Sequence, residues 1–210
     1  TFNMICGVLT PSGGTVTLGG RDISSLSTHR RARLGIGRTF QRLEVFSSMS
    51  VRDNIVVGAE IRESWARTTP AGPQLLAGGA DLDRDDEVSL ILERLGLMDV
   101  AESRVGELPT GQARLVELGR ALAIRPKVLR RDEPASGLDD AETASLASLI
   151  AELTAAGLAV LLVEHDVPLV MSVCSMIYVL DFGRIIASGT PDQVQQNQTV
   201  LDAYLGSGSR

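Results

Sequence analysis

The most constraining feature of this 210-residue chain is the stretch Val128–Asp140, which reads VLRRDEPASGLDD. It predicts a short strand that Pro134 stops directly after two adjacent carboxylates, Asp132 and Glu133. Open α/β sheets collect ligands at the carboxyl edge of their strands. At that edge one carboxylate can hold Mg²⁺ while the next polarises a water molecule that attacks a phosphate. An Asp-Glu pair can also be a solvated turn that closes a strand, so the neighbouring segments have to decide between these interpretations.

Three further segments carry polar side chains in a fixed order: RTFQ at Arg38–Gln41, LPTGQ at Leu108–Gln112 and VEHD at Val163–Asp166. Together with DEPASGLD at Asp132–Asp139, they resemble motifs of ABC-type ATPases, the ATP-binding-cassette subunits of ABC transporters. RTFQ resembles the Q-loop, and LPTGQ resembles the signature motif that is usually written LSGGQ. DEPASGLD resembles the Walker B motif with its D-loop, and VEHD resembles the switch-histidine segment. Each match is weak alone, but four matches in the family's order make a specific signal.

The resemblance implies an α/β fold of the P-loop NTPase class. Its central sheet would be mostly parallel, with a small antiparallel β subdomain and a helical subdomain at about residues 50–125, all within one ABC ATPase domain over residues 1–210. Thr1–Gly7 reads as the interior of a helix that ends at a glycine. The phosphate-binding sequence GxxxxGK[ST] occurs nowhere in these residues. We therefore expect a domain without its N-terminal strands and P-loop, which in this form binds ATP poorly.

The resemblance also assigns roles to single residues. Asp132 would bind Mg²⁺, Glu133 would be the general base, and Gln41 would contact both the metal and the attacking water. His165 would contact the γ-phosphate of ATP. The remaining nucleotide-binding residues would be those of the signature motif and the D-loop: Leu108, Pro109, Thr110, Gly111, Gln112, Ser136, Gly137, Leu138 and Asp139. In this family the signature motif reaches the ATP held by another subunit, so one site would need two chains.

The signature-like segment departs from LSGGQ at two positions, where Pro109 replaces the serine and Thr110 replaces the first glycine. The change removes one hydroxyl donor to phosphate. The cassettes of branched-chain amino-acid importers commonly have LPxGQ here, so the departure indicates a subfamily. The stretch VLDFGRIIASGTPDQV and the ending AYLG resemble the same cassettes. Thr110 is predicted to cap a helix that begins near Gly111 and carries an apolar stripe of Leu115, Leu118 and Leu122.

Two arginines, Arg130 and Arg131, fit the predicted strand badly. A strand that is buried between helices should be nearly continuous in apolar residues. Successive strand residues face opposite sides of a sheet, so each face receives one guanidinium. Burying either charge without a partner costs several kcal/mol. Two explanations are open: an altered sequence, or a strand that is less covered than its neighbours.

Local patterns predict the elements around these motifs. A hairpin is expected around Gly19–Gly20, and a short basic helix over Thr28–Arg33. Ser50 is expected to be the N-cap of an amphipathic helix, and a second helix to run from Asp85 to Leu95. Further expected elements are a helix over Ala141–Ala156, a buried parallel strand over Leu158–Val163, strands over Met176–Leu180 and Arg184–Ala187, and a polar helix that begins at Pro191.

Charge and composition narrow the possible partners. The chain has 20 basic and 26 acidic residues, a formal charge of -6, and no long basic run. It therefore lacks the electrostatic footprint of a nucleic-acid binder. No apolar run approaches the roughly 20 residues that a membrane helix needs. If this protein acts at a membrane, we expect it to do so by binding a partner that is embedded in that membrane.

The sequence therefore predicts an ATPase subunit that binds ATP and Mg²⁺ and powers an importer for branched-chain or other amino acids. It would pair as a homodimer, or with another ABC ATPase subunit, on transmembrane permease subunits at the cytoplasmic face of the membrane. Two alternatives stay open. One is an ABC-type ATPase of repair or chromosome structure, although the short segment Ser64–Asp81 has no room for a long coiled coil. The other is a non-hydrolysing regulatory or binding module.

Overall fold

The computed structural model describes residues 2–39, 43–65 and 82–205. In chain order the elements are α1 (Phe2–Ile5), β1 (Thr17–Leu18), β2 (Arg21–Asp22), α2 (Thr28–Arg33), β3 (Ile36–Arg38), α3 (Val51–Trp65), α4 (Arg84–Arg94), the 3₁₀ turns η1 (Met98–Val100) and η2 (Val105–Glu107), α5 (Thr110–Ala123), β4 (Val128–Asp132), α6 (Asp140–Ala155), β5 (Ala159–Val163), α7 (Val167–Val173), β6 (Ile177–Asp181), β7 (Arg184–Gly189), α8 (Pro191–Gln195) and α9 (Gln198–Leu205).

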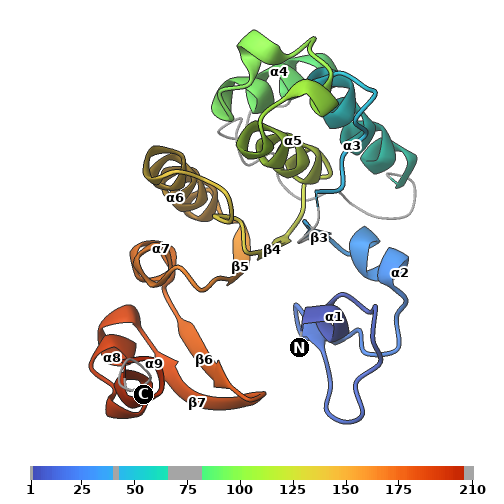
Figure 1. Cartoon of the computed structure of the whole chain (residues 1–210). Helices are drawn as coiled ribbons and strands as arrows, with labels where there is room; N and C mark the ends of the chain where they lie inside the picture. The colour runs from blue at the N-terminus through green and yellow to red at the C-terminus, as the bar shows by residue number, and fades with distance from the viewer. Residues whose placement is uncertain (1, 40–42, 66–81, 206–210) are drawn as a thin grey trace.

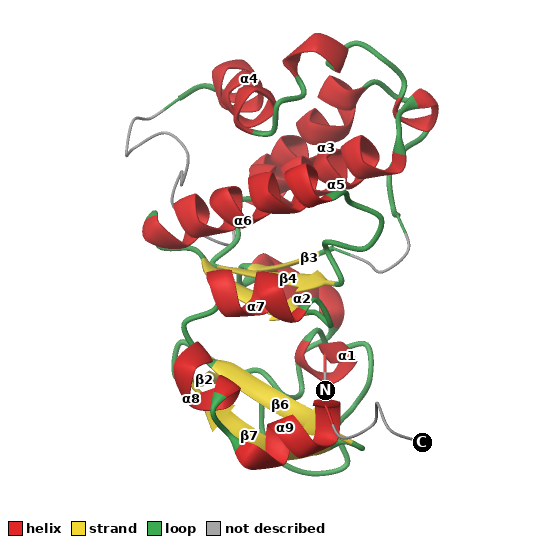
Figure 2. Ribbon diagram, turned by 60° about the vertical axis from the view of Figure 1, so that its left-hand side comes forward, coloured by secondary structure: helices red, strands yellow, loops and turns green. Residues whose placement is uncertain are grey.

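A small parallel sheet, β3–β5, lies at the middle of the molecule (Figure 1). The helices α3, α4, α5 and α6 lie together above it in Figure 2, and α2 and α7 lie on its lower side. The antiparallel pair β6–β7 packs with α8 and α9 at the far end, and the small β1–β2 pair belongs to the N-terminal part. The predicted fold is therefore confirmed: a parallel sheet, small antiparallel pairs and a group of helices.

The central sheet has the strand order β3-β4-β5, and both pairs are parallel. The predicted parallel strand over Leu158–Val163 is confirmed as β5. Its predicted burial is wrong, because Ala159 is exposed and the next four residues are only half-buried. Within the described residues β5 pairs along one edge only, with β4, so its other edge has no strand to cover it.

Local side-chain signals set several of the helix boundaries. The predicted N-cap of α3 is confirmed, since the hydroxyl of Ser50 accepts a hydrogen bond from the amide of Asp53 at 3.0 Å. The carboxylate of Asp83 caps α4 in the same way, at 2.9 Å from the amide of Asp86. The basic helix predicted over Thr28–Arg33 is α2, with the same bounds. These boundaries follow from side chains within one turn of each helix end.

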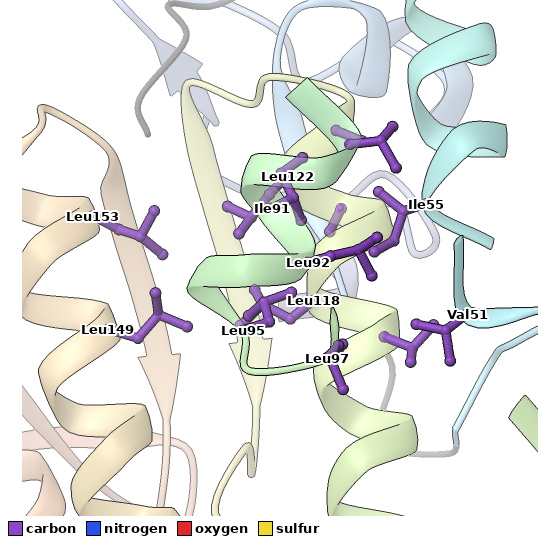
Figure 3. Packing of buried hydrophobic residues seen from close by; sticks show 14 of the residues in the cluster. Val51, Ile55, Ile91, Leu92, Leu95, Leu97, Leu118, Leu122, Leu149 and Leu153 are labelled. Atoms are coloured by element: carbon purple, nitrogen blue, oxygen red, sulfur yellow. The ribbon is translucent and has the colours of Figure 1, made fainter. Parts of the chain in front are cut away.

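The main hydrophobic core lies between α3, α4, α5 and α6 (Figure 3). Ile55 of α3 points toward Leu92 of α4, and Val51 lies beside Leu97, which follows α4. Leu149 and Leu153 extend this core from α6. Helices α3 and α5 approach so closely that a Cβ atom on Gly58 would lie 2.4 Å from the carbonyl oxygen of Arg120. Only glycine allows this approach, so the position of α5 over the sheet depends on it.

A buried carboxylate joins three helices above the sheet. The side chain of Glu87 on α4 is 8% exposed and accepts a hydrogen bond from Arg62 Nη1 at 2.7 Å. It also accepts bonds from Arg125 Nε and Nη2, at 2.8 and 3.0 Å. Arg62 comes from α3, and Arg125 follows α5. Because every charge in this group meets an opposite charge, its burial is compensated and the three helices are held in one arrangement.

Arg31 holds the end of α1 in place. Its side chain is 2% exposed and donates to the carbonyl oxygens of Met4, Ile5, Ser24 and Leu26, at 2.6 to 2.8 Å. Two of these carbonyls belong to the last turn of α1, and that of Met4 also accepts a hydrogen bond from the amide of Gly7 at 3.1 Å. Arg31 therefore fixes the first helix against the segment that leads into α2.

The predicted strands near the C-terminus are confirmed as the antiparallel pair β6–β7. Large apolar side chains on this pair are exposed, among them Tyr178, Leu180 and Ile185. Among the described helices, none combines the length and the apolarity that crossing a lipid bilayer requires.

Candidate functional site

Asp132 is the last residue of β4, and Glu133 follows it at the carboxyl edge of the central sheet. Glu133 has a φ of 47°, and its amide donates to the carbonyl oxygen of Val163 at 2.8 Å. The backbone turns sharply here while it stays attached to β5. Both carboxylate residues are partly exposed, so a ligand at the sheet edge can reach them.

His165 lies at the same sheet edge. It follows β5 by two residues, and β4 and β5 are parallel neighbours with Asp132 opposite Val163. The carboxyl ends of parallel strands share one edge, so the structure brings His165 to the side where Asp132 and Glu133 lie. The imidazole is 76% exposed, and its Nδ1 atom lies 3.6 Å from Glu164 Oε2. It is free to meet a ligand from outside.

Glu164 is a residue that the sequence analysis missed. Its side chain is 1% exposed. Its Oε1 atom accepts a hydrogen bond from the amide of Ala135 at 2.8 Å, and its Oε2 atom accepts one from the amide of His165 at 3.0 Å. One carboxylate thus ties the loop after β4 to the loop after β5. A charged residue directly after an apolar strand was the available signal, but its partner lies 29 residues away.

Gln41 lies outside the described residues, so its place beside Asp132 stays a prediction. The strand that leads toward it, β3, pairs with β4. The amide of Thr39 donates to the carbonyl oxygen of Arg130 at 3.1 Å. Up to Thr39, the chain therefore runs beside the end of β4, in the direction that the Q-loop resemblance requires.

The signature-like segment leads into α5. Leu108 is half-buried, Pro109 and Thr110 are exposed, Gly111 is buried and Gln112 is half-buried. The prediction that Thr110 caps the helix is wrong, because α5 begins at Thr110 and the N-cap residue is Pro109, which makes no side-chain hydrogen bond. Thr110 already has helical geometry, and a capping side chain must come from the residue before the first turn. The predicted stripe is present, with Leu118 and Leu122 buried and Leu115 half-buried.

The D-loop-like segment Ser136–Asp139 joins β4 to α6. Turn hydrogen bonds fold it, one of them accepted by the carbonyl oxygen of Glu133 at 3.1 Å. Asp139 then caps α6 in a reciprocal pair of hydrogen bonds with Glu142. A Cβ atom on Gly111 would lie 2.8 Å from Glu142 Oε1, so the start of α5 touches the start of α6. The signature-like and D-loop-like segments of this chain are therefore neighbours.

Arg130 and Arg131 are 3% and 4% exposed, so the explanation that their strand is less covered is wrong. Arg130 Nη2 donates to Asp132 Oδ2 at 2.5 Å, and the guanidinium carbon lies 4.9 Å from the centre of the Phe2 ring. Among the described residues, Nε and Nη1 of Arg131 have no hydrogen-bond partner. Burial lowers the pKa of Arg131 to about 10, against the attraction of Glu117.

The surroundings of Asp132 fit a Mg²⁺ ion only in part. The carboxylate stands at a strand end with 24% of its side chain exposed, and carboxylate oxygens are suitable Mg²⁺ ligands. However, Oδ2 already accepts a bond from Arg130. In the part of the chain that the structure describes, no three His, Cys, Asp or Glu side chains form a group that could hold a metal ion. A metal ion bound by Asp132 would meet a guanidinium on the same carboxylate.

Two family models match this chain. The model described as ABC transporter matches residues 1–136. The model described as branched-chain amino acid ATP-binding cassette transporter matches residues 184–209.

Named relatives and solved structures agree with these matches. The high-affinity branched-chain amino acid transport ATP-binding protein LivG of Salmonella typhimurium is 37% identical over 98% of this chain and 81% of its own length. BraF of Pseudomonas aeruginosa, which carries the same description, is 36% identical with the same coverage. The ADP conformation of an ATP-binding cassette of an ABC transporter has a TM-score of 0.79 and 29% identity, and the alignment covers 98% of this chain and 82% of that one. In sequence motifs, fold and relatives alike, this chain belongs to the ABC transporter family of ATP-binding cassette proteins.

Proposed function

We propose that this chain is the ATP-binding and ATP-hydrolysing subunit of an ABC importer for branched-chain amino acids. The match of residues 184–209 to the branched-chain family model carries the proposal, because that segment lies outside the general ABC match. The similarity to LivG and BraF supports the same solute class. The solute itself would be recognised by other subunits, so this part of the proposal rests on subfamily analogy.

The proposed chemistry uses the edge of the central sheet. Glu133 would act as general base toward a water molecule in line with the γ-phosphate, and His165 would contact that phosphate. Asp132 and Gln41 would hold Mg²⁺, which when bound neutralises charge on the phosphate oxygens. The hydrogen bonds of Glu164 to the loops after β4 and β5 support this proposal, since they keep Glu133 and His165 in fixed relation.

A second subunit would complete each site. The contact between Gly111 and Glu142 supports the view that the signature-like and D-loop-like segments present one surface to a partner. The residues of that surface would be Leu108, Pro109, Thr110, Gly111, Gln112, Ser136, Gly137, Leu138 and Asp139. The partner would be a second copy or another ABC ATPase subunit. Nucleic acid is not a proposed partner.

The place of action would be the cytoplasmic face of the membrane, with the protein bound peripherally to transmembrane permease subunits. Residues 50–125, which include α3, α4 and α5, would be the helical subdomain of a single ATPase domain and would contact the permease. The 210 residues by themselves would hydrolyse ATP weakly, because they contain no GxxxxGK[ST] sequence to hold the β- and γ-phosphates.

A second candidate is a regulatory module that binds nucleotide without hydrolysing it. The hydrogen bond from Arg130 to Asp132 favours this candidate, since the negative charge of the carboxylate proposed to hold the metal is already paired with a guanidinium. The two candidates differ in whether Glu133 takes part in turnover.

The test is ATP turnover by this protein, reconstituted with its permease in liposomes. Replacing Glu133 with Gln should lower kcat by about 100-fold or more, because it removes the proposed general base. The control is Asp192→Asn, an exposed carboxylate on α8 that lies outside residues 50–125 and away from the sheet edge, which should leave kcat unchanged. Absence of hydrolysis in the wild type would support the regulatory module. Uptake of labelled leucine that requires ATP would support the solute class, and ATP-driven uptake of an unrelated solute alone would contradict it.

A further inference from the structure

The contact between Arg130 and Asp132 is built into β4. The two residues are two positions apart on one strand, so their side chains leave the same face of the sheet. Arg130 Nη2 donates a charge-assisted hydrogen bond to Asp132 Oδ2 at 2.5 Å. The Arg130 side chain is 4% exposed and the Asp132 side chain 24% exposed. The carboxylate thus meets solvent on one side and a buried cation on the other.

The surroundings of Arg130 make this carboxylate its main charged partner. Within the described residues, the Arg130 side chain makes one hydrogen bond, to Asp132, and its Nε atom has no hydrogen-bond partner. The ring of Phe2 covers the guanidinium at 4.9 Å. A neutral ring attracts a cation but does not neutralise it. The buried charge of Arg130 is therefore balanced chiefly by Asp132.

We propose that Arg130 is a built-in competitor for the carboxylate of Asp132, which weakens the binding of a divalent cation at the end of β4. The proposal rests on the metal-binding role proposed above for Asp132. A divalent cation on that carboxylate would lie within roughly 5 Å of the guanidinium, close enough for strong repulsion between like charges. Binding then requires Arg130 to withdraw from Oδ2 or to tolerate the second cation. Either way, part of the attraction between carboxylate and metal is lost.

Arg131 provides a matched control on the same strand. It is equally buried, but it faces the opposite side of β4, and no hydrogen bond joins it to Asp132 within the described residues. Replacing either arginine with Met removes one buried positive charge and keeps an unbranched side chain. A general effect of net charge or of strand stability would then appear in both variants. An effect on the carboxylate of Asp132 would appear in the Arg130 variant alone.

The experiment titrates the isotope-labelled 210-residue chain with Mn²⁺ alone and follows the paramagnetic broadening of the Glu133 amide signal, which reports metal at the neighbouring carboxylate. Arg130→Met should lower the apparent Kd for Mn²⁺ by about tenfold or more, because a like charge beside the metal is removed. Arg131→Met should leave the Kd within about twofold of the wild type, since it lies on the other face. Arg130→Lys keeps the positive charge and should also stay near the wild type. Circular dichroism shows whether each variant is folded.

Equal Kd values for the wild type and Arg130→Met would overturn the proposal, provided that Asp132→Asn abolishes the broadening. That result would leave the metal-binding role of Asp132 intact. Broadening that is the same in Asp132→Asn as in the wild type and in Arg130→Met would overturn both the competition and the metal-binding role. Tighter binding in both methionine variants would assign the effect to net charge and also overturn the proposal.

Discussion

Replacing Arg131 with Leu should make this protein more stable. Arg131 is 4% exposed in the middle strand of the central sheet, and two of its three guanidinium nitrogens have no hydrogen-bond partner among the described residues. Leucine suits a strand that is covered on both faces, where apolar residues are the rule. The substitution also removes a charge whose hydration is lost on folding.

The pKa of Arg131 sets the size of the effect. Burial lowers this pKa to about 10, and the nearby Arg114 adds to the fall, whereas Glu117 and Glu164 oppose it. A change of one in a pKa corresponds to about 1.4 kcal/mol, so burying the charge costs the folded state on the order of 3 kcal/mol. Leucine fills less volume than arginine, and without the guanidinium the negative charges of Glu117 and Glu164 lose part of their balancing positive charge. A net gain of about 2 kcal/mol remains, within the range for replacing buried charges with apolar side chains.

Urea unfolding and thermal melting at pH 8, followed by circular dichroism, measure this gain. A gain of about 2 kcal/mol should raise the Tm by roughly 4–8 °C in a chain of this length. The pKa of Arg131 is lower in the folded state than in the unfolded chain, so above pH 10 the unfolded wild type binds more protons than the folded wild type. The free energy of unfolding of the wild type therefore rises with pH in that range. The difference between Arg131→Leu and wild type should therefore be fully present at pH 8 and shrink above pH 10.

Arg130→Leu is the control for this prediction. Arg130 has Asp132 as a charged partner and Phe2 as an aromatic one, so its removal should yield no gain of similar size. An unchanged or lower Tm in Arg131→Leu would refute the reasoning, because it would mean that Arg131 is solvated or paired in solution. Equal gains from both substitutions would show that strand propensity, and not the missing partner, decides the outcome.

Two further predictions concern the helices above the sheet. Glu87→Gln should cost about 3–5 kcal/mol in urea unfolding, because it removes the buried carboxylate that balances two arginines; a loss below about 1 kcal/mol would mean that neutral acceptors satisfy those arginines. Gly58→Ala should lower the Tm and cost about 1–3 kcal/mol, since its Cβ atom would lie 2.4 Å from the backbone carbonyl oxygen of Arg120. Gly119→Ala is its control and should cost less, because its Cβ atom would meet only the movable ends of side chains, at 2.9 Å; equal losses would contradict the backbone clash.

Much of the fold was predictable because short-range chemistry decides it. The helix over Thr28–Arg33 and the N-cap at Ser50 depend on residues within one turn, and the structure reproduces both. Strands of the parallel sheet were visible as short runs that end at Gly, Pro or charged residues. The burial of β5 was mispredicted, since burial depends on what lies beside a strand and not on the strand's own residues.

The candidate site was predictable in part. Asp132 ends one strand, and Glu133 and His165 follow two strands that pair in parallel, so their motifs alone placed them at one sheet edge. The role of Thr110 was mispredicted as the N-cap, whereas it is the first residue of α5. The two positions are neighbours, and residue types alone do not locate a helix end to within one residue. Gln41 stays a prediction.

The order of the motifs, the N-cap at Ser50 and the membership in the ABC family can be read from the sequence, since each depends on residue types at fixed spacings. Tertiary structure alone decided that Arg130 holds Asp132, that Arg131 has no hydrogen-bond partner on two of its nitrogens among the described residues, and that Glu164 joins two loops. The partner of a buried charge is set by which distant segment of the chain packs beside it, or by which face of a strand the side chain leaves. The interaction energy of a buried charge with its partner depends on their distance and burial, and the sequence alone gives neither quantity.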